Sequence, residues 1–126
     1  MNKVGEPIFV IQEHNAKHAG LHHDFRLEEN GVLRSWVIRN CTPAKPGIRR
    51  LAIQVDNHPM EYATFEGELG PMPGEGKVTL YDQGPYKRLE DKSWSLLVEL
   101  HGEVISGQYY LRHWKDNKWL IWKRGG

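Results

Sequence analysis

The chain has 126 residues, of which 39% are hydrophobic and 26% are charged, and its formal net charge is +1. This length predicts one domain, spanning residues 1–126, with a single core. The nearly neutral charge excludes a bulk polycation, so any nucleic-acid contact must come from a local basic patch. The lone Cys41 and the polar start predict a cytoplasmic protein. The lack of a long apolar run predicts that it has no membrane span.

Short β-rich segments separated by turn residues make up the first half of the chain. Strands are predicted at 8–12, 22–28 and 33–38. Asn30 and Gly31 predict a hairpin turn between the last two, because both residues tolerate positive φ. A loop at 43–47 and a strand at 51–55 follow, and a turn at 56–59 is expected to end that strand.

The second half continues the same pattern. Residues 60–65 predict one helical turn or a short strand, and residues 67–76 predict an irregular loop rich in Gly and Pro. Further strands are expected at 77–81, ended by a turn at 82–85, and at 93–100, 107–114 and 118–123. About eight short strands predict a mostly β protein, a compact antiparallel barrel or sandwich with short helical turns; a barrel would be closed or partly closed.

One face of the predicted strand at 22–28 carries candidate metal ligands. Side chains alternate along a strand, so His22 and Asp24 share a face while His23 lies on the other. Imidazole and carboxylate ligands suit Mn, Zn or Fe. A third ligand would come from His14, at the end of the preceding strand, or from His18. The alternative is a solvated histidine-rich turn in which one histidine has a structural hydrogen bond.

Two further side chains could act on a phosphate. Arg26 continues the face of the candidate ligands, and its planar fork suits a phosphate oxygen; the alternative is a surface ion pair with Glu28. His58 could be a general acid or a phosphate donor, and Tyr62 follows it on the same side of a helical turn. The alternative for His58 is a place in an ordinary polar turn.

With these residues in place, the chain resembles the 3′-phosphoesterase domain of bacterial DNA ligase D and its small stand-alone archaeal relatives. The matching blocks include residues 9–14, 21–28 and 50–63, and the resemblance covers roughly residues 8–123. The His-x-Asp-Phe-Arg-Leu-Glu block and the later His-Pro-x-x-Tyr-Ala block together form a specific pair.

The resemblance implies a compact β-barrel that holds a divalent metal, Mn²⁺ first and Zn²⁺ or another divalent transition metal as alternatives. The residues carried over are His14, His22 and Asp24 for the metal, Arg26, His58 and Tyr62 for catalysis, and Gln12 with Arg26 and His58 for substrate binding.

The implied activity is that of a metal-dependent phosphoesterase that processes DNA 3′ ends. It would remove a 3′-phosphate or a 3′-ribonucleotide from DNA or RNA–DNA primer-template ends and leave a 3′-OH. A DNA ligase and a polymerase of non-homologous end joining are its candidate partners in trans. Two alternatives are a catalytically weak module that binds nucleic-acid ends on the same barrel, and a histidine-rich metalloprotein of cupin type.

The chain departs from the family pattern at several positions. Two extra residues at 19–20 make His18 a candidate for the first ligand, and Asn40 replaces the usual lysine. Arg39 is the nearest cation, and strand alternation predicts that it points to the opposite face. Only seven residues precede Ile8, where the family has a charged arm, so phosphate removal is expected more than ribonucleotide removal.

Overall fold

The computed structural model describes residues 6–16, 20–68 and 76–125, which form nine strands and one short 3₁₀ helix. The order of these elements along the chain is β1 (Ile8–Ala16), β2 (Gly20–Glu29), β3 (Val32–Arg39), β4 (Arg49–Pro59), η1 (Met60–Thr64), β5 (Gly67–Glu68), β6 (Lys77–Lys92), β7 (Ser95–His101), β8 (Ser106–Lys115) and β9 (Lys118–Lys123).

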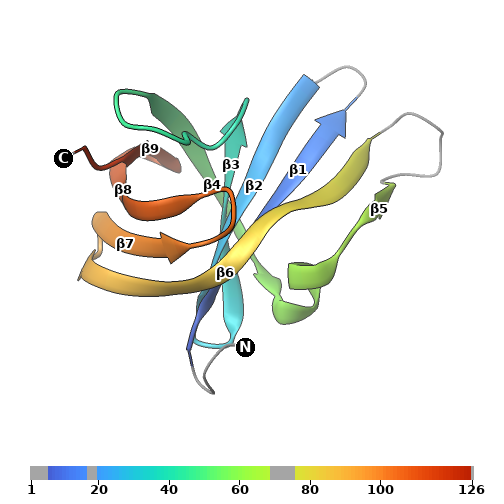
Figure 1. Cartoon of the computed structure of the whole chain (residues 1–126), viewed down its shortest axis with the longest axis horizontal. Coiled ribbons are helices and arrows are strands. Elements are labelled where there is room, and N and C mark those ends of the chain that lie inside the picture. The colour runs from blue at the N-terminus through green and yellow to red at the C-terminus, as the bar shows by residue number, and fades with distance from the viewer. Residues whose placement is uncertain (1–5, 17–19, 69–75, 126) are drawn as a thin grey trace.

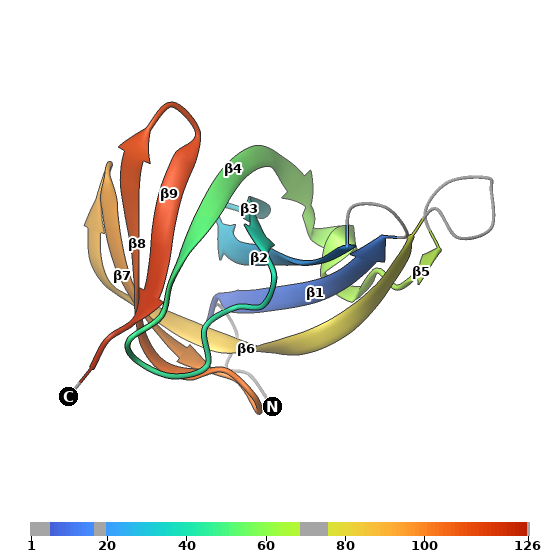
Figure 2. The ribbon, with the colours of Figure 1, turned by 90° about the horizontal axis from the view of Figure 1, so that it is seen from above.

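Eight of the strands close into an antiparallel barrel (Figures 1 and 2). Their order around the barrel is β1-β2-β3-β4-β9-β8-β7-β6, and pairing of β6 with β1 completes the circle. The short β5 pairs with the start of β6. The predicted antiparallel barrel, expected to be closed or partly closed, is therefore confirmed, and it is closed. No helix among the described residues is long and apolar enough to cross a membrane.

Local turn chemistry fixes the hairpin of β2 and β3. Asn30 and Gly31 have φ values of 53° and 81°, as the Asn-Gly pattern predicts for a tight hairpin turn. This turn sets a register in which Arg26 lies opposite Ser35 and Asp24 opposite Val37. Residues 60–64 form a helical turn rather than a strand.

Two predicted turns lie inside long strands. β4 continues to Pro59 because, after a bulge, its last residues pair with the start of β3. β6 has 16 residues and runs through the predicted turn at 82–85. It pairs with β1 over its first half and with β7 over its second, so it passes from one side of the barrel to the other. The irregular loop predicted at 67–76 lies outside the described residues from 69 to 75.

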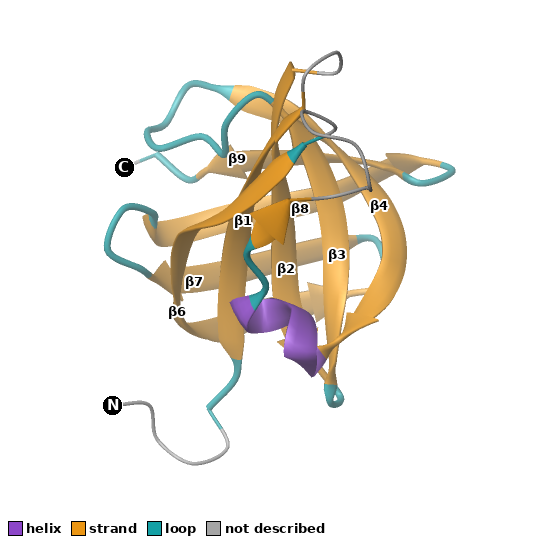
Figure 3. Cartoon of the chain, turned by 90° about the vertical axis from the view of Figure 1, so that its right-hand side faces the viewer, coloured by secondary structure: helices purple, strands orange, loops and turns teal. Residues whose placement is uncertain are grey.

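The barrel interior holds the main core, which includes Phe25, Trp36 and Tyr109, all with no exposed surface. A smaller apolar cluster lies on the outside of the barrel, where Ala63 of η1 packs against Val10 and Leu33. Burying an aliphatic side chain contributes about 1.5–3 kcal/mol. The outer cluster therefore holds η1 against the barrel wall, in front of β2 and β3 (Figure 3).

Asp82 of β6 fastens the connection between β7 and β8. Its carboxylate is 6% exposed and accepts hydrogen bonds from the backbone N–H groups of Gln83, Glu103, Val104 and Ile105, at 2.7–3.0 Å. One carboxylate thus satisfies backbone donors from two distant parts of the chain.

Replacing Asp82 with Ala should lower the free energy of unfolding by about 3 kcal/mol, because several buried N–H groups would lose a charged acceptor. Urea denaturation followed by tryptophan fluorescence measures this change. The matched control is Asp91→Ala, which removes an exposed carboxylate from the same strand and should cost less than about 0.5 kcal/mol. Equal losses in the two variants would contradict this role for Asp82.

Candidate metal and phosphate site

The candidate site lies on the outer face of β1 to β4, under η1. A cavity of about 340 Å³ opens there. Its walls combine polar residues predicted from the sequence with apolar residues of the strands and of the segment after η1: Gln12, His14, Asp24, Arg26, Val37, Val55, His58, Tyr62, Phe65 and Val78. Elements far apart in sequence thus meet at one place.

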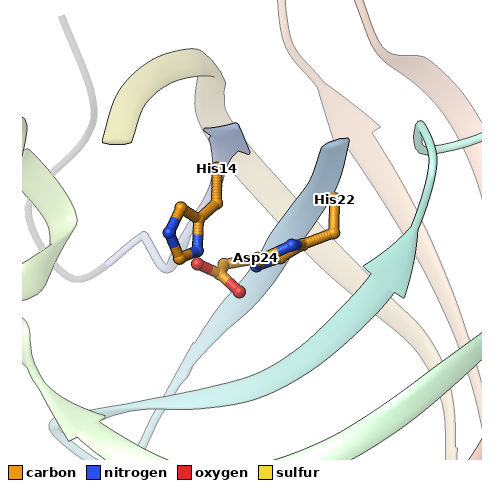
Figure 4. Close-up of side chains that lie close together, drawn as sticks. All are labelled: His14, His22 and Asp24. Atoms are coloured by element: carbon orange, nitrogen blue, oxygen red, sulfur yellow. The ribbon is translucent and has the colours of Figure 1, made fainter. Parts of the chain in front are cut away.

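Two histidines and an aspartate converge beside this cavity. In the pairing of β1 with β2, His14 lies opposite His22, and Asp24 follows on the same face of β2. One candidate ligand atom from each side chain lies within 4.8 Å of the others. The two imidazole rings meet edge to face with centroids 4.3 Å apart, and the Asp24 carboxylate lies next to them (Figure 4). The sequence placed these residues together, and they do meet.

The chemistry of this cluster fits a divalent transition metal. Two imidazoles and one carboxylate leave coordination positions open for water or substrate. Burial lowers the pKa of His22 despite the opposing charge of Asp24, and this favours the neutral imidazole that a metal requires. His14 Nε2 is buried without a hydrogen-bond partner among the described residues. His18, the alternative first ligand, lies outside the described residues.

Arg26 lies on the same face of β2 as Asp24, and hydrogen-bond acceptors surround its guanidinium. It is 4% exposed; its Nε donates to Gln12 Oε1 and its Nη1 to Ser35 Oγ, both at 2.7 Å. Its Nη2 lies 3.7 Å from Asp24 Oδ2, so its nearest carboxylate is the candidate metal ligand rather than Glu28. Burial lowers the pKa of Arg26, yet a guanidinium stays charged at neutral pH.

Gln12 joins the arginine to the covering helix. While its Oε1 accepts from Arg26, its Nε2 donates to the backbone carbonyls of Tyr62 and Phe65, at 2.5 and 3.1 Å. Gln12 is 1% exposed, so its hydrogen bond with Arg26 is shielded from water, and its bonds to the Tyr62 and Phe65 carbonyls are partly shielded. Gln12 therefore links the position of η1 to the orientation of Arg26.

His58 and Tyr62 form the side of the cavity facing Arg26. His58 Nδ1 lies 3.1 Å from Arg26 Nη1 and 2.9 Å from the carbonyl oxygen of Asp56. A proton on Nδ1 bonds to Asp56, whereas an unprotonated Nδ1 accepts from Arg26; in both cases Nε2 is left for a ligand. The Tyr62 ring centroid lies 4.8 Å from that of His58 and 5.6 Å from Arg26 Cζ.

Ser35 is a site residue that residue-type reasoning missed. Its Oγ accepts from Arg26 and donates to the Leu33 carbonyl at 2.9 Å, so it orients the guanidinium. The signal was present in the sequence: the two-residue turn at Asn30 and Gly31 fixes a register in which position 35 faces position 26.

His23 points into the barrel, away from the cavity, as strand alternation predicts. The Thr42 backbone N–H donates to its Nδ1 at 2.9 Å, so the ring proton is on Nε2, which faces Glu13 Oε1 at 3.3 Å. Burial lowers the pKa of His23 because the charged imidazolium would lose its hydration, although the hydrogen bond and the charge of Glu13 oppose this shift. This histidine has a structural role.

The sequence is similar to known proteins over nearly its whole length. A family model described as the DNA ligase D 3′-phosphoesterase domain matches residues 12–113. The multifunctional non-homologous end joining protein LigD of Mycobacterium bovis is 43% identical over 117 residues, which are 89% of this chain and 15% of that protein. The protein of the same name from Pseudomonas aeruginosa is 35% identical over 125 residues, 91% of this chain and 15% of that protein. The chain thus spans about 15% of the length of these relatives.

Protonation of His23 should make the protein less stable in mild acid. Its folded-state pKa is lowered, so the unfolded state binds the extra proton more readily. Stability is full above the unfolded pKa of about 6.5 and falls as the pH drops below it. Urea midpoints measured between pH 7.5 and 5.5 with a metal chelator should fall less in His23→Gln than in the wild type. The control is His101→Gln, which removes an exposed imidazole and should keep the dependence; identical profiles for His23→Gln and the wild type would contradict the assignment.

Proposed function

The chain belongs to the DNA ligase D 3′-phosphoesterase domain family, and on that premise we propose that it is a divalent-metal-dependent phosphoesterase that processes the 3′ ends of DNA. The observation that carries the proposal is the meeting of a His-His-Asp cluster, the buried Arg26 and His58 around one cavity. A phosphoryl group in this cavity would have a metal on one side and two nitrogen donors on the other.

Charge stabilisation is the first part of the proposed mechanism. His14, His22 and Asp24 would hold a divalent ion, Mn²⁺ first and Zn²⁺ as an alternative, which would supply Lewis acidity toward a phosphoryl oxygen and water. Arg26 already donates to Gln12 and Ser35, so its orientation is fixed before substrate arrives. Its remaining N–H groups can bond the equatorial phosphate oxygens without reorganisation, and preorganised donors of this kind lower the barrier.

Proton transfer is the second part. When the P–O3′ bond breaks and water adds to phosphorus, the leaving 3′ oxygen takes up a proton. His58 can hold that proton at Nε2, because its Nδ1 is engaged with Arg26 or the Asp56 carbonyl. Tyr62 packs on His58 and beside Arg26, and thereby keeps both groups aimed at one phosphate.

The proposed substrate is a DNA or RNA–DNA primer-template end with a 3′-phosphate, and 3′-ribonucleotide removal is a second reaction of the same site. The product is a 3′-OH end, which is the nucleophile that a polymerase or a DNA ligase needs. Such enzymes of non-homologous end joining are the proposed partners, because the relatives are named for that process.

A second candidate function is a module that binds nucleic-acid ends with little turnover. It is favoured by Asn40, since a lysine at this place in the family would supply a charge that this chain lacks. Both functions require tight binding of the DNA end. Only the enzyme requires metal-dependent release of phosphate.

Asp24→Asn should lower phosphate release from a 3′-phosphate primer-template at least about 100-fold in the presence of Mn²⁺, because the amide is a neutral and much weaker ligand. Released phosphate gives the rate, and equilibrium dialysis gives the bound Mn²⁺. Bound metal should fall together with activity.

The control is Asp91→Asn, an exposed carboxylate at the far end of β6, and it should behave as the wild type. Tight binding of the end by the wild type with no release of phosphate at any metal concentration would favour the end-binding module. Full activity of Asp24→Asn would overturn the proposed mechanism.

A further inference from the structure

A second cavity, which we call the upstream cavity, lies beside the candidate site on the outer face of β3 and β4. Its volume is about 500 Å³, and its polar residues are Arg39, Asn40, Arg49 and Arg50. Val37 borders both this cavity and the one beside the metal cluster, so the two are neighbours. None of these arginines is used in the proposed chemistry.

Arg39 belongs to the same face of the barrel as the metal cluster. It lies directly opposite His22 in the pairing of β2 with β3. The expectation that it would point away from position 40 is wrong, because β3 ends at Arg39 and Asn40 has a φ of 69°. This left-handed residue breaks the alternation, so that both side chains line the upstream cavity.

No carboxylate in the part of the chain that the structure describes neutralises the charge of the upstream cavity. Arg39, Arg49 and Arg50 form no ion pair with a carboxylate of residues 6–16, 20–68 or 76–125. The Nε of Arg50 is also buried without a hydrogen-bond partner there. Three arginines around a concave surface create a positive potential that attracts a polyanion, although the net charge of the chain is only +1.

One of these cations is held in place by an aromatic ring. Arg49 lies opposite Trp122 in the pairing of β4 with β9, and its Cζ is 4.4 Å from the centroid of the indole. Arg112 approaches the same indole at 5.7 Å. Stacking restricts the guanidinium while leaving its N–H donors free, which lowers the entropy cost of binding an anion.

We propose that the upstream cavity binds backbone phosphates of the strand whose 3′ end is processed, through Arg39 and Arg49. This inference rests on the proposed function. Adjacent strands are about 4.8 Å apart, so β4 lies roughly 10 Å from β2 across the barrel wall. A nucleic-acid strand advances about 3.4 Å along the helix axis per nucleotide, so the phosphates about three nucleotides before the end reach this cavity.

The test compares two substrates that carry the same 3′-phosphate: a nucleoside 3′-phosphate, which has no upstream phosphate, and a duplex of about 12 base pairs. The variants are Arg39→Gln/Arg49→Gln, Trp122→Leu, and the control Lys87→Gln, which removes an exposed cation from β6. The double variant should raise KM for the duplex about 10-fold or more with little change in kcat. It should also reduce the slope of log KM against log salt by about two, since each phosphate contact contributes about 0.9.

The nucleoside 3′-phosphate separates a loss of upstream binding from structural damage. The double variant should show the rise in KM on the duplex alone, and Lys87→Gln should match the wild type on both substrates. Trp122→Leu should reproduce part of the rise in duplex KM, and only while Arg49 is present. Equal losses on both substrates would mean that the arginines support the fold or the chemistry, and this would overturn the proposal. An unchanged duplex KM and salt slope would overturn it too.

A direct measurement of duplex binding tests the upstream cavity independently of the proposed enzymatic function. Fluorescence anisotropy of the labelled duplex is measured with Asp24→Asn protein, with and without the Arg39→Gln/Arg49→Gln changes. If the wild type shows no turnover, the proposed function fails, and weaker binding by the double variant still supports the upstream cavity. Equal binding by both proteins would overturn the cavity assignment whether or not the enzyme is active.

Discussion

The site depends on the strict alternation of side chains along β2. His23, Phe25 and Leu27 face the barrel interior and are almost completely buried. Residues 22, 24 and 26 consequently face outward beside one another, carrying two groups that fit a metal and one that fits a phosphate. Because a slip of one residue would exchange the two faces, the burial energy of the core also fixes the position of the chemistry.

Burying a charged guanidinium is unfavourable in free energy, and the hydrogen-bond partners of Arg26 offset this penalty. Leaving a charged group buried without partners would destabilise the protein by several kcal/mol. Gln12 and Ser35 accept from Arg26, and Gln12 also bonds the backbone of η1. The outer apolar cluster also packs η1 against the barrel. Stability and preorganisation of the phosphate donors thus come from the same contacts.

Sequence patterns predicted the elements governed by local rules. The alternation of β2 and the Asn30-Gly31 turn depend only on neighbouring residues. The helical turn that brings Tyr62 to His58 was one of two alternatives for residues 60–65. The full lengths of β4 and β6 were missed, because pairing with distant segments overrides the turn preference of residues 56–59 and 82–85. The placement of Asn40 beside Arg39 in one cavity was missed, because Asn40 is left-handed, which ends the alternation, and its N–H donates to the Leu21 carbonyl across the sheet.

The outer face of the closed barrel under η1 carries the imidazole, carboxylate and guanidinium groups of the candidate site. The main question is what this face binds. The most direct test is an anomalous difference map from crystals containing Mn²⁺ and inorganic phosphate. We expect one metal peak coordinated by His14, His22 and Asp24, with a phosphate contacting Arg26 and His58. A peak coordinated by His18 in place of His14 would contradict the ligand assignment, and a metal bound away from this face would contradict the account as a whole.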